Sequence, residues 1–370
     1  MKKIKVVFVS ATFKAGTGFG IMEHGLRLFE SLKKYGKSVE PYTLSIPSSR
    51  LFDLFNKNIR ISGKNSVKTE NKTGEGPLPK PDIIHYVSPD IFALDPITSR
   101  ILNRKAKKVI SIHDLYTVNK IPKIGLTNYI NIRGSGPFLR LKIYFITKAV
   151  HYFHKIGLKS AVRKADHFLC VSEPTRDDLI KIFKVPLDKT SVVYNVVNDS
   201  FKPIKHKKAE KIIIGHISSF DYNKNVETLI KAFKMVKLDA FELHLYGARL
   251  PFDISDDKRI KYFGHVDNIM DAYRSFDVFA FPSRWEGFGM PAMEAKRCKI
   301  PVITYAKGEL PDIVKRNTIQ FKDEADLARI IKEKTWRKVN LEKAYKDSEE
   351  CTEKAIAGKL EKIYKSLMGP

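Results

Sequence analysis

Short runs of β-branched and aromatic residues alternate along this chain with longer stretches of helical periodicity. We expect strands at 4–10, 39–44, 83–87, 109–113, 167–171 and 191–195, and again at 212–217, 242–246, 260–263, 278–281 and 301–305. Helical stretches such as 22–35, 225–236 and 326–332 lie between them. This alternation predicts parallel sheets covered by helices on both faces, and two sets of strands predict two Rossmann-like, doubly wound α/β domains.

The length of 370 residues suits two domains, each large enough to bury a core. We expect the join in the polar, basic segment 196–211, which contains Pro203. The prediction is an N-terminal domain over 1–196, a C-terminal domain over 197–345 and a C-terminal helical segment over 346–370. That last segment could pack on either domain, including back on the N-terminal one.

The formal net charge of +26 favours anionic partners. Residues 101–170 hold fourteen Lys and Arg but only two acids. Within them, 137–165 interleaves aromatic residues with lysines at near-helical spacing, which leaves two interpretations open. The segment is either a core helix with a solvated basic face, or a helix that rests on an anionic membrane or holds an acidic acceptor. No nucleic-acid recognition motif is present, so nucleic acid is not an expected partner.

Targeting signals are also missing from the sequence pattern. No apolar run approaches the roughly 20 residues that span a bilayer, and the basic, apolar start at 1–14 is interpreted as a first strand rather than a signal peptide. The three cysteines lie far apart, which indicates reduced thiols in a cytosolic protein. We therefore expect a cytoplasmic location, with peripheral association at the inner face of the membrane as an option.

The segment 284–301, RWEGFGMPAMEAKRCKIP, places Glu286 and Glu294 on either side of a Gly-Phe-Gly-Met-Pro sequence. On a single helix, eight residues at about 100° each would leave these carboxylates about 80° apart. The glycines break regular structure, whereas Pro291 suits the first turn of a helix. We therefore expect Glu286 in the loop after the strand at 278–281 and Glu294 in the second turn of the next helix. Both can then reach one ligand at the carboxyl end of a strand.

The expected ligand follows from charge. The first turn of a helix attracts phosphate, whereas a carboxylate repels phosphate and is better used as an acceptor for neutral hydroxyls. A ligand that offers both phosphates and many hydroxyls is a nucleotide sugar. The alternative is a strand-loop-helix turn with incidental acids, because short motifs often match by chance.

With these residues in view, the stretch 263–314 resembles the C-terminal signature of retaining glycosyltransferase family 4, including its Glu-x7-Glu motif. The stretches 170–198, 215–233 and 16–36 resemble three further segments of that family. The resemblance implies a GT-B fold, in which two Rossmann-like domains face each other across a cleft and the second holds most of the donor nucleotide.

The resemblance also implies roles around the acidic motif. Glu286 would accept hydroxyls of the donor sugar, and Glu294 would hold ribose hydroxyls. The backbone of Phe288, Gly289 and Met290 would approach the sugar and the phosphates.

Further residues are implied outside that motif. Lys224 matches the lysine that neutralises the diphosphate, and His113 matches the histidine near the reacting sugar. Gly16 and Gly18 of the opening glycine-rich loop would permit close backbone approach to the substrate.

Two departures from the family pattern stand out. The usual phosphate-binding arginine is missing before Lys224, so His216 is expected to replace it in part, with Arg249 and Arg284 as alternatives. Lys299 occupies a position where glycine is usual, which calls the local backbone geometry into question.

The predicted function is retaining hexosyl transfer from a nucleoside-diphosphate sugar to a glycan or a polyprenyl-phosphate-linked acceptor, by a front-face mechanism. No metal is expected, since the sequence has no Asp-x-Asp, and no cofactor beyond the donor as co-substrate. The alternatives are a nucleotide-sugar epimerase of the same architecture and a non-catalytic protein that binds nucleotide sugars.

Overall fold

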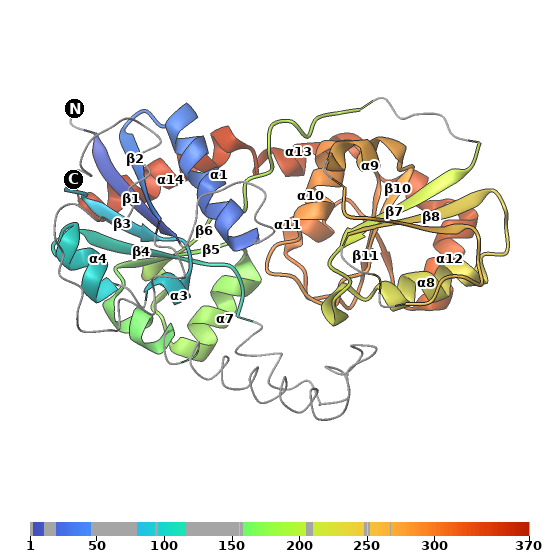
Figure 1. The fold of residues 1–370 in the computed structure, drawn as a ribbon, viewed down its shortest axis with the longest axis horizontal. Helices are drawn as coiled ribbons and strands as arrows, with labels where there is room; N and C mark the ends of the chain where they lie inside the picture. The colour runs from blue at the N-terminus through green and yellow to red at the C-terminus, as the bar shows by residue number, and fades with distance from the viewer. Residues whose placement is uncertain are drawn as a thin grey trace. The chain divides into compact units, whose positions relative to one another are not determined.

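The structure is a computed structural model that describes residues 3–10, 20–45, 80–92, 95–115, 155, 158–204, 210–247, 250, 252–266 and 268–369. The chain divides into two compact units, which we describe separately (Figure 1). Unit 1 takes its described residues from 1–122, 146–196 and 351–370, and unit 2 takes its described residues from 197–350.

Unit 1 is built on a six-stranded parallel sheet in the order β2-β1-β3-β4-β5-β6. Its strands are β1 (Ile4–Ser10), β2 (Val39–Ser45), β3 (Ile83–Tyr86), β4 (Lys107–Ile112), β5 (His167–Cys170) and β6 (Thr190–Val192). Its described helices include α1 (Gly20–Tyr35), α3 (Pro89–Phe92), α4 (Asp95–Ile101), α7 (Glu173–Phe183) and α14 (Glu353–Met368). The strand order reverses between β1 and β3, so polar groups after these strands meet at one edge of the sheet.

Unit 2 holds a second six-stranded parallel sheet, in the order β12-β11-β10-β7-β8-β9. The strands are β7 (Ile212–Ser218), β8 (Phe241–Gly247), β9 (Ile260–Gly264), β10 (Val278–Phe281), β11 (Val302–Tyr305) and β12 (Ile319–Phe321). The helices are α8 (Val226–Met235), α9 (Ile269–Ser275), α10 (Met290–Arg297), α11 (Asp312–Lys315), α12 (Glu324–Glu333) and α13 (Leu341–Glu349). Here the order reverses between β7 and β10, as in a dinucleotide-binding Rossmann domain.

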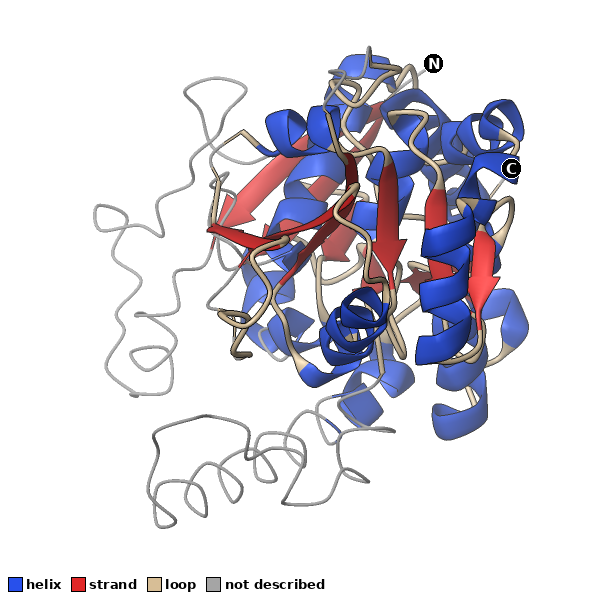
Figure 2. Cartoon of the chain, turned by 90° about the vertical axis from the view of Figure 1, so that its right-hand side faces the viewer, coloured by secondary structure: helices blue, strands red, loops and turns tan. Residues whose placement is uncertain are grey.

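Helices cover the sheets because alternate strand residues point to opposite faces (Figure 2). In unit 2, Ile214, Val278 and Ile303 belong to one core cluster with the apolar residues of α8 and α12. Gly215 lies next to Ile214, and a Cβ there would stand only 2.3 Å from the ring of Phe276, which follows α9. Glycine is therefore required where this side of β7 meets the aromatic ring.

The predicted fold class is confirmed: each of the eleven expected strands occurs, in two parallel α/β sheets. The boundaries differ in places, since β6 ends at Val192 rather than at 195. The strand β12 was not predicted, because its three residues, IQF, are too short to show a period. Among the helices in the described part of the chain, none combines the length and apolar character that crossing a membrane would need.

The last helix, α14, belongs to unit 1 and packs beside α1. Glu361 fixes it to the turn before β2, where its Oε1 accepts from the amides of Lys37 and Ser38, each at 2.6 Å, and from Ser38 Oγ at 2.9 Å. These donors lower the pKa of Glu361 although its partial burial acts in the opposite direction.

His85 links the same helix to the interior of the sheet. The ring is fully buried, with Nδ1 2.8 Å from Tyr364 Oη of α14 and Nε2 2.8 Å from Ser111 Oγ of β4. Burial, assisted by the nearby His113, lowers the pKa of His85 from 6.5 to about 3. The imidazole is therefore neutral in the folded protein at neutral pH.

We expect His85 to make the folded state sensitive to acid. Between pH 6.5 and about 3, His85 binds a proton in the unfolded chain but not in the native protein. Stability is therefore lost as the pH falls through this window. One such group lowers the free energy of unfolding by about 1.4 kcal/mol per pH unit. Urea unfolding from pH 7 to pH 4 should show a shallower decline for His85→Gln than for the wild type. The exposed His265 supplies a control, His265→Gln, which should keep the wild-type slope; equal slopes in all three proteins would refute the role of His85.

Lys299, which follows α10, has a φ of 56°, in the left-handed region. A side chain with a Cβ is disfavoured there by about 1–2 kcal/mol, whereas glycine is not. We therefore expect Lys299→Gly to exceed Lys299→Ala in free energy of unfolding by about 1 kcal/mol. Both variants lose the ion pair with Glu342, so the difference isolates the backbone. Denaturant unfolding that ranks the alanine variant equal or higher would contradict this interpretation.

Candidate functional site

The loops that follow β7 and β10 bring Lys224 and Glu286 together. Lys224 Nζ lies 2.8 Å from Glu286 Oε1 and 2.9 Å from Oε2. The two side chains are only 21% and 11% exposed. Ser283, which is fully buried, donates from Oγ to Glu286 Oε1 at 2.8 Å. This pair lies at the carboxyl ends of the two strands where the order of the sheet reverses, the usual ligand site of an open α/β sheet.

Hydrogen bonds across the two loops support the pair. The amide of Arg284 donates to Asn223 O at 2.7 Å, and Asn223 Nδ2 donates to Trp285 O at 3.3 Å. Asn225 Nδ2 donates to Pro282 O at 3.1 Å. Backbone and side-chain amides thus tie the loop of Lys224 to the loop of Glu286 at several points.

A third loop, after β11, joins this arrangement through Glu309. The amide of Glu286 donates to Glu309 O at 3.2 Å, and the amide of Glu309 donates to Arg284 O at 2.7 Å. The Arg284 side chain donates to Tyr222 O at 2.6 Å and stacks over the Tyr222 ring at 4.3 Å. The guanidinium predicted as one alternative phosphate ligand is thus engaged with the loop itself, while Arg249, the other alternative, lies outside the described residues.

Helix α10 begins directly after the loop that follows β10, as the sequence predicted. Gly289 precedes it with a φ of 109°, and a Cβ there would lie 3.3 Å from both Phe281 and Val314, so only glycine fits without strain. Met290 starts the helix, where Pro291 lacks an amide hydrogen and the next two amides donate to Gly289 O at 3.2 and 3.4 Å. The side chain of Phe288 is buried, so Phe288 can offer a ligand only its backbone.

Glu294 lies in the second turn of α10, also as predicted. Its Oε2 accepts from Tyr273 Oη of α9 at 2.9 Å, and the same hydroxyl is 3.0 Å from Pro291 O. Burial, together with the charge of Glu294, raises the pKa of Tyr273 well above 10, so the phenol keeps its proton. Glu294 is thereby held at one oxygen by a neutral donor.

The structure places His216 inside the second sheet, whereas the prediction placed it among the phosphate ligands. The ring is fully buried within β7, with Nδ1 donating to Ala280 O at 2.9 Å and Nε2 2.8 Å from Ser218 Oγ. Burial outweighs the bond to Ala280 and lowers the pKa of His216 to about 4. A buried neutral ring cannot replace an arginine on phosphate. It instead orients Ser218, whose Oγ accepts from the amide of Phe220 at 3.0 Å.

In unit 1, His113 follows β4. Its Nε2 lies 2.8 Å from Val87 O, and because a carbonyl can only accept, this nitrogen carries the proton. The ring meets His24 of α1 edge to face, with centroids 4.6 Å apart. Burial lowers the pKa of His24 well below 6.5, with His113 contributing, so His24 is neutral. Gly16 and Gly18 lie outside the described residues.

Three further residues shape the site and were not predicted from the sequence: Ser283, Asn225 and Tyr273. The first two stand within three residues of Glu286 and Lys224, so a search of the neighbouring polar residues could have found them. Tyr273 is remote from Glu294 in sequence and gave no signal.

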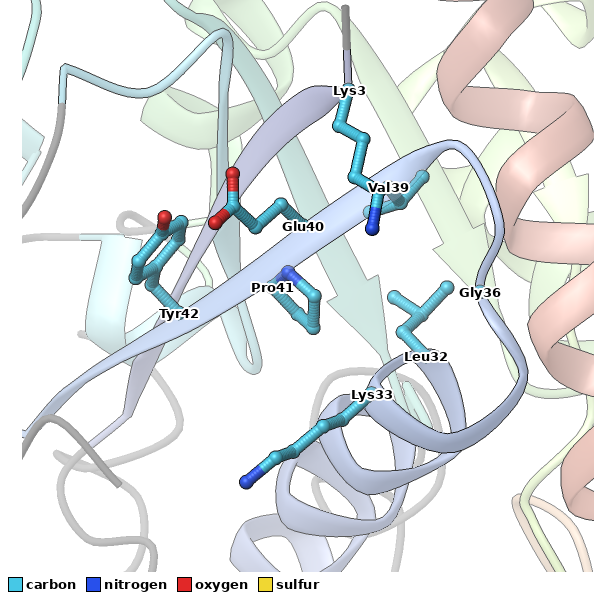
Figure 3. A pocket seen from close by; sticks show the side chains of 8 residues that line it. All are labelled: Lys3, Leu32, Lys33, Gly36, Val39, Glu40, Pro41 and Tyr42. Atoms are coloured by element: carbon cyan, nitrogen blue, oxygen red, sulfur yellow. The ribbon is translucent and has the colours of Figure 1, made fainter. Parts of the chain in front are cut away.

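A separate surface pocket of about 180 Å³ lies in unit 1 (Figure 3). It is lined by Lys3, Leu32, Lys33, Gly36, Val39, Glu40, Pro41 and Tyr42. These residues lie at the amino ends of β1 and β2 and the end of α1, whereas His113 follows the carboxyl end of β4. The pocket is therefore not part of the candidate site.

Known protein families match the chain in both units. The family model Glycosyltransferase Family 4 matches residues 37–201, and the model Glycosyl transferases group 1 matches residues 197–346. The O-antigen chain mannosyltransferase RfbU of Salmonella typhimurium is 30% identical over 43% of this chain and 46% of its own length. The O-antigen chain mannosyltransferase B of Escherichia coli is 25% identical over 45% of this chain and 49% of its own. The chain thus matches about half the length of these curated relatives.

Solved structures extend the similarity of fold to almost the whole chain. Anabaena Alr3699/HepE, in complex with UDP and glucose, aligns with a TM-score of 0.63 at 17% identity, covering 98% of this chain and all of its own. Sucrose-phosphate synthase from Thermosynechococcus elongatus aligns with a TM-score of 0.67 at 18% identity, covering 99% of each chain. These structures show that the chain has the GT-B fold, and the two adjoining family models show that it belongs to the glycosyltransferases of the group 1 and family 4 type.

Proposed function

We propose that this protein transfers a hexosyl group from a nucleoside-diphosphate sugar to a glycan or lipid-linked acceptor, with retention of configuration. The observation that carries the proposal is the contact between Lys224 and Glu286 at the reversal point of the second sheet. A cation for phosphate and a carboxylate for hydroxyls stand side by side there. The amino end of α10 adds the positive end of a helix dipole, which favours an anion.

In this proposal the donor replaces the contact between the two charged groups with contacts of its own. The diphosphate takes the ammonium of Lys224 and lies at the amino end of α10. The sugar hydroxyls donate to Glu286, and ribose hydroxyls donate to Glu294. Each charge exchanges one partner for another, so neither is left unpaired in a partly buried site.

Transfer breaks the bond between the anomeric carbon and the phosphate oxygen and forms a bond to the acceptor oxygen on the same face. Negative charge grows on the leaving diphosphate, where Lys224 and the dipole of α10 stabilise it without a metal ion. The leaving phosphate oxygen accepts the proton of the acceptor hydroxyl. His113, oriented by its bond to Val87 O, is proposed to contact the reacting sugar.

The names of the relatives suggest which donors to test first. RfbU is named a mannosyltransferase, and HepE was solved with UDP and glucose and also with UDP-glucose. We therefore favour hexoses carried on uridine or guanosine diphosphate. UDP, GDP, UDP-glucose and GDP-mannose form a compact first panel.

We expect at least one member of this panel to raise the melting temperature of the protein, because a ligand that prefers the native state stabilises it. Lys224→Met and Glu286→Gln should each lower nucleotide release from the effective donor by about 10²–10³-fold, the effect of losing one preorganised electrostatic group. The exposed pair Glu227–Lys231 on α8 supplies the control Lys231→Met, which should retain wild-type turnover. Full turnover in Glu286→Gln would remove this residue from the mechanism.

The acceptor and the location are proposed from charge. A net charge of +26, with a strongly basic first half, suits a phosphate-bearing or membrane-bound acceptor reached from the cytoplasmic side. We expect the protein to float with vesicles that contain anionic lipid and to be released as ionic strength rises. Neutral vesicles are the control, and absence of the protein from both floated fractions would remove the membrane proposal.

A further inference from the structure

We propose that Asn225 and Ser283 are positioning residues, which hold Lys224 and Glu286 in place while the donor is bound. This inference rests on the function proposed above and assigns separate tasks to the two residues. Asn225 fixes the loop that presents the phosphate-binding ammonium. Ser283 fixes the carboxylate that accepts the sugar hydroxyls.

Asn225 has a left-handed backbone conformation and directly follows Lys224. It stands between the short 3₁₀ helix η5 (Tyr222–Lys224) and α8, with φ 55° and ψ 32°. Glycine and asparagine are the residues that tolerate this region best. Its side chain is almost fully buried, at 4% exposure, although it directly follows Lys224.

An asparagine at a helix start usually caps the helix with its side chain, but within the described chain Asn225 does not cap α8. Its Nδ2 instead donates across the strand reversal to Pro282 O at 3.1 Å. This orientation is fixed by chemistry, because a carbonyl can only accept.

The orientation leaves Asn225 Oδ1 buried with no hydrogen-bond partner in the part of the chain that the structure describes. An unpaired buried acceptor destabilises the folded state. A glycine would satisfy the same backbone conformation without that cost. The asparagine is therefore better explained by the bond between the loops than by the stability of α8.

The bond from Asn225 reaches the residue just before Ser283, so the two loops are joined by adjacent links. Lys224 contacts Glu286, and its neighbour Asn225 contacts Pro282. A shift of the Lys224 loop relative to β10 would have to break both contacts. Asn225 thus sets the position from which the ammonium can turn towards a diphosphate.

Ser283 holds Glu286, the other member of the ion pair. Glu286 Oε1 accepts from both Ser283 and Lys224, whereas Oε2 lies within bonding distance of Lys224 at 2.9 Å. When Lys224 turns to the phosphates, the hydroxyl of Ser283 still holds Oε1. The carboxylate then keeps its direction at the moment when Oε2 is needed for a sugar hydroxyl.

Binding to two classes of probe separates these tasks. The affinities of UDP and GDP report the phosphate site, and the additional affinity of UDP-glucose or GDP-mannose over the matching diphosphate reports the sugar site. If the wild type binds none of the four probes, the proposed function itself fails. If it binds a diphosphate, the variants test the present inference alone.

Asn225→Gly keeps the backbone conformation and removes the link between the loops. We expect its diphosphate affinity to fall about tenfold, while its midpoint of urea unfolding stays close to the wild-type value. Asn317→Gly is a matched control, because Asn317 also has a positive φ, of 52°, and donates from Nδ2 to Asp347, away from the site. Wild-type affinity in Asn225→Gly, or an equal loss in Asn317→Gly, overturns the role of Asn225.

Ser283→Ala should retain diphosphate affinity and lose most of the additional affinity that the sugar contributes, about tenfold. Ser348→Ala is the matched control, since Ser348 is an equally buried serine that donates to a backbone carbonyl of α13. An unchanged sugar contribution in Ser283→Ala overturns its role. So does a parallel loss of diphosphate and sugar affinity, which a purely structural serine would produce.

Discussion

The ion pair between Lys224 and Glu286 is the interaction on which the rest of the second unit depends. Two opposite charges, both mostly removed from solvent, are tolerable only where each satisfies the other and further hydrogen bonds support them. The protein meets this condition with three loops, after β7, β10 and β11, which share hydrogen bonds within a few residues of the pair. The strand reversal between β7 and β10 makes this possible, because it brings their carboxyl ends together.

The same constraint explains the local backbone. A loop must turn sharply after β10 and present a helix start, which places Gly289 at a positive φ between Phe281 and Val314. Asn225 meets the equivalent demand after β7 in the left-handed region. Strained or glycine-dependent positions thus flank both charged residues, as expected where side chains are held for a ligand rather than for packing.

The departures from the family pattern divide into two kinds. At Lys299 the departure lies in the backbone, since the lysine takes up a left-handed conformation and its side chain lies near α13. At His216 it concerns charge, because the buried imidazole sits deep in β7 and organises the loop through Ser218. Lys224 and the amino end of α10 are therefore the groups to which our proposal assigns phosphate binding.

The sequence by itself determined the two parallel sheets, because strand-like and helix-like runs alternate along the chain. This alternation can be recognised without knowledge of any tertiary contact. It also determined that Glu286 belongs to a loop and Glu294 to the following helix, since glycine and proline act on the local backbone. Only the tertiary structure decided that Lys224 contacts Glu286 and that Tyr273 contacts Glu294. It also decided that His216 is buried. Strand order creates these contacts between residues far apart in sequence, and no local pattern records which strands become neighbours.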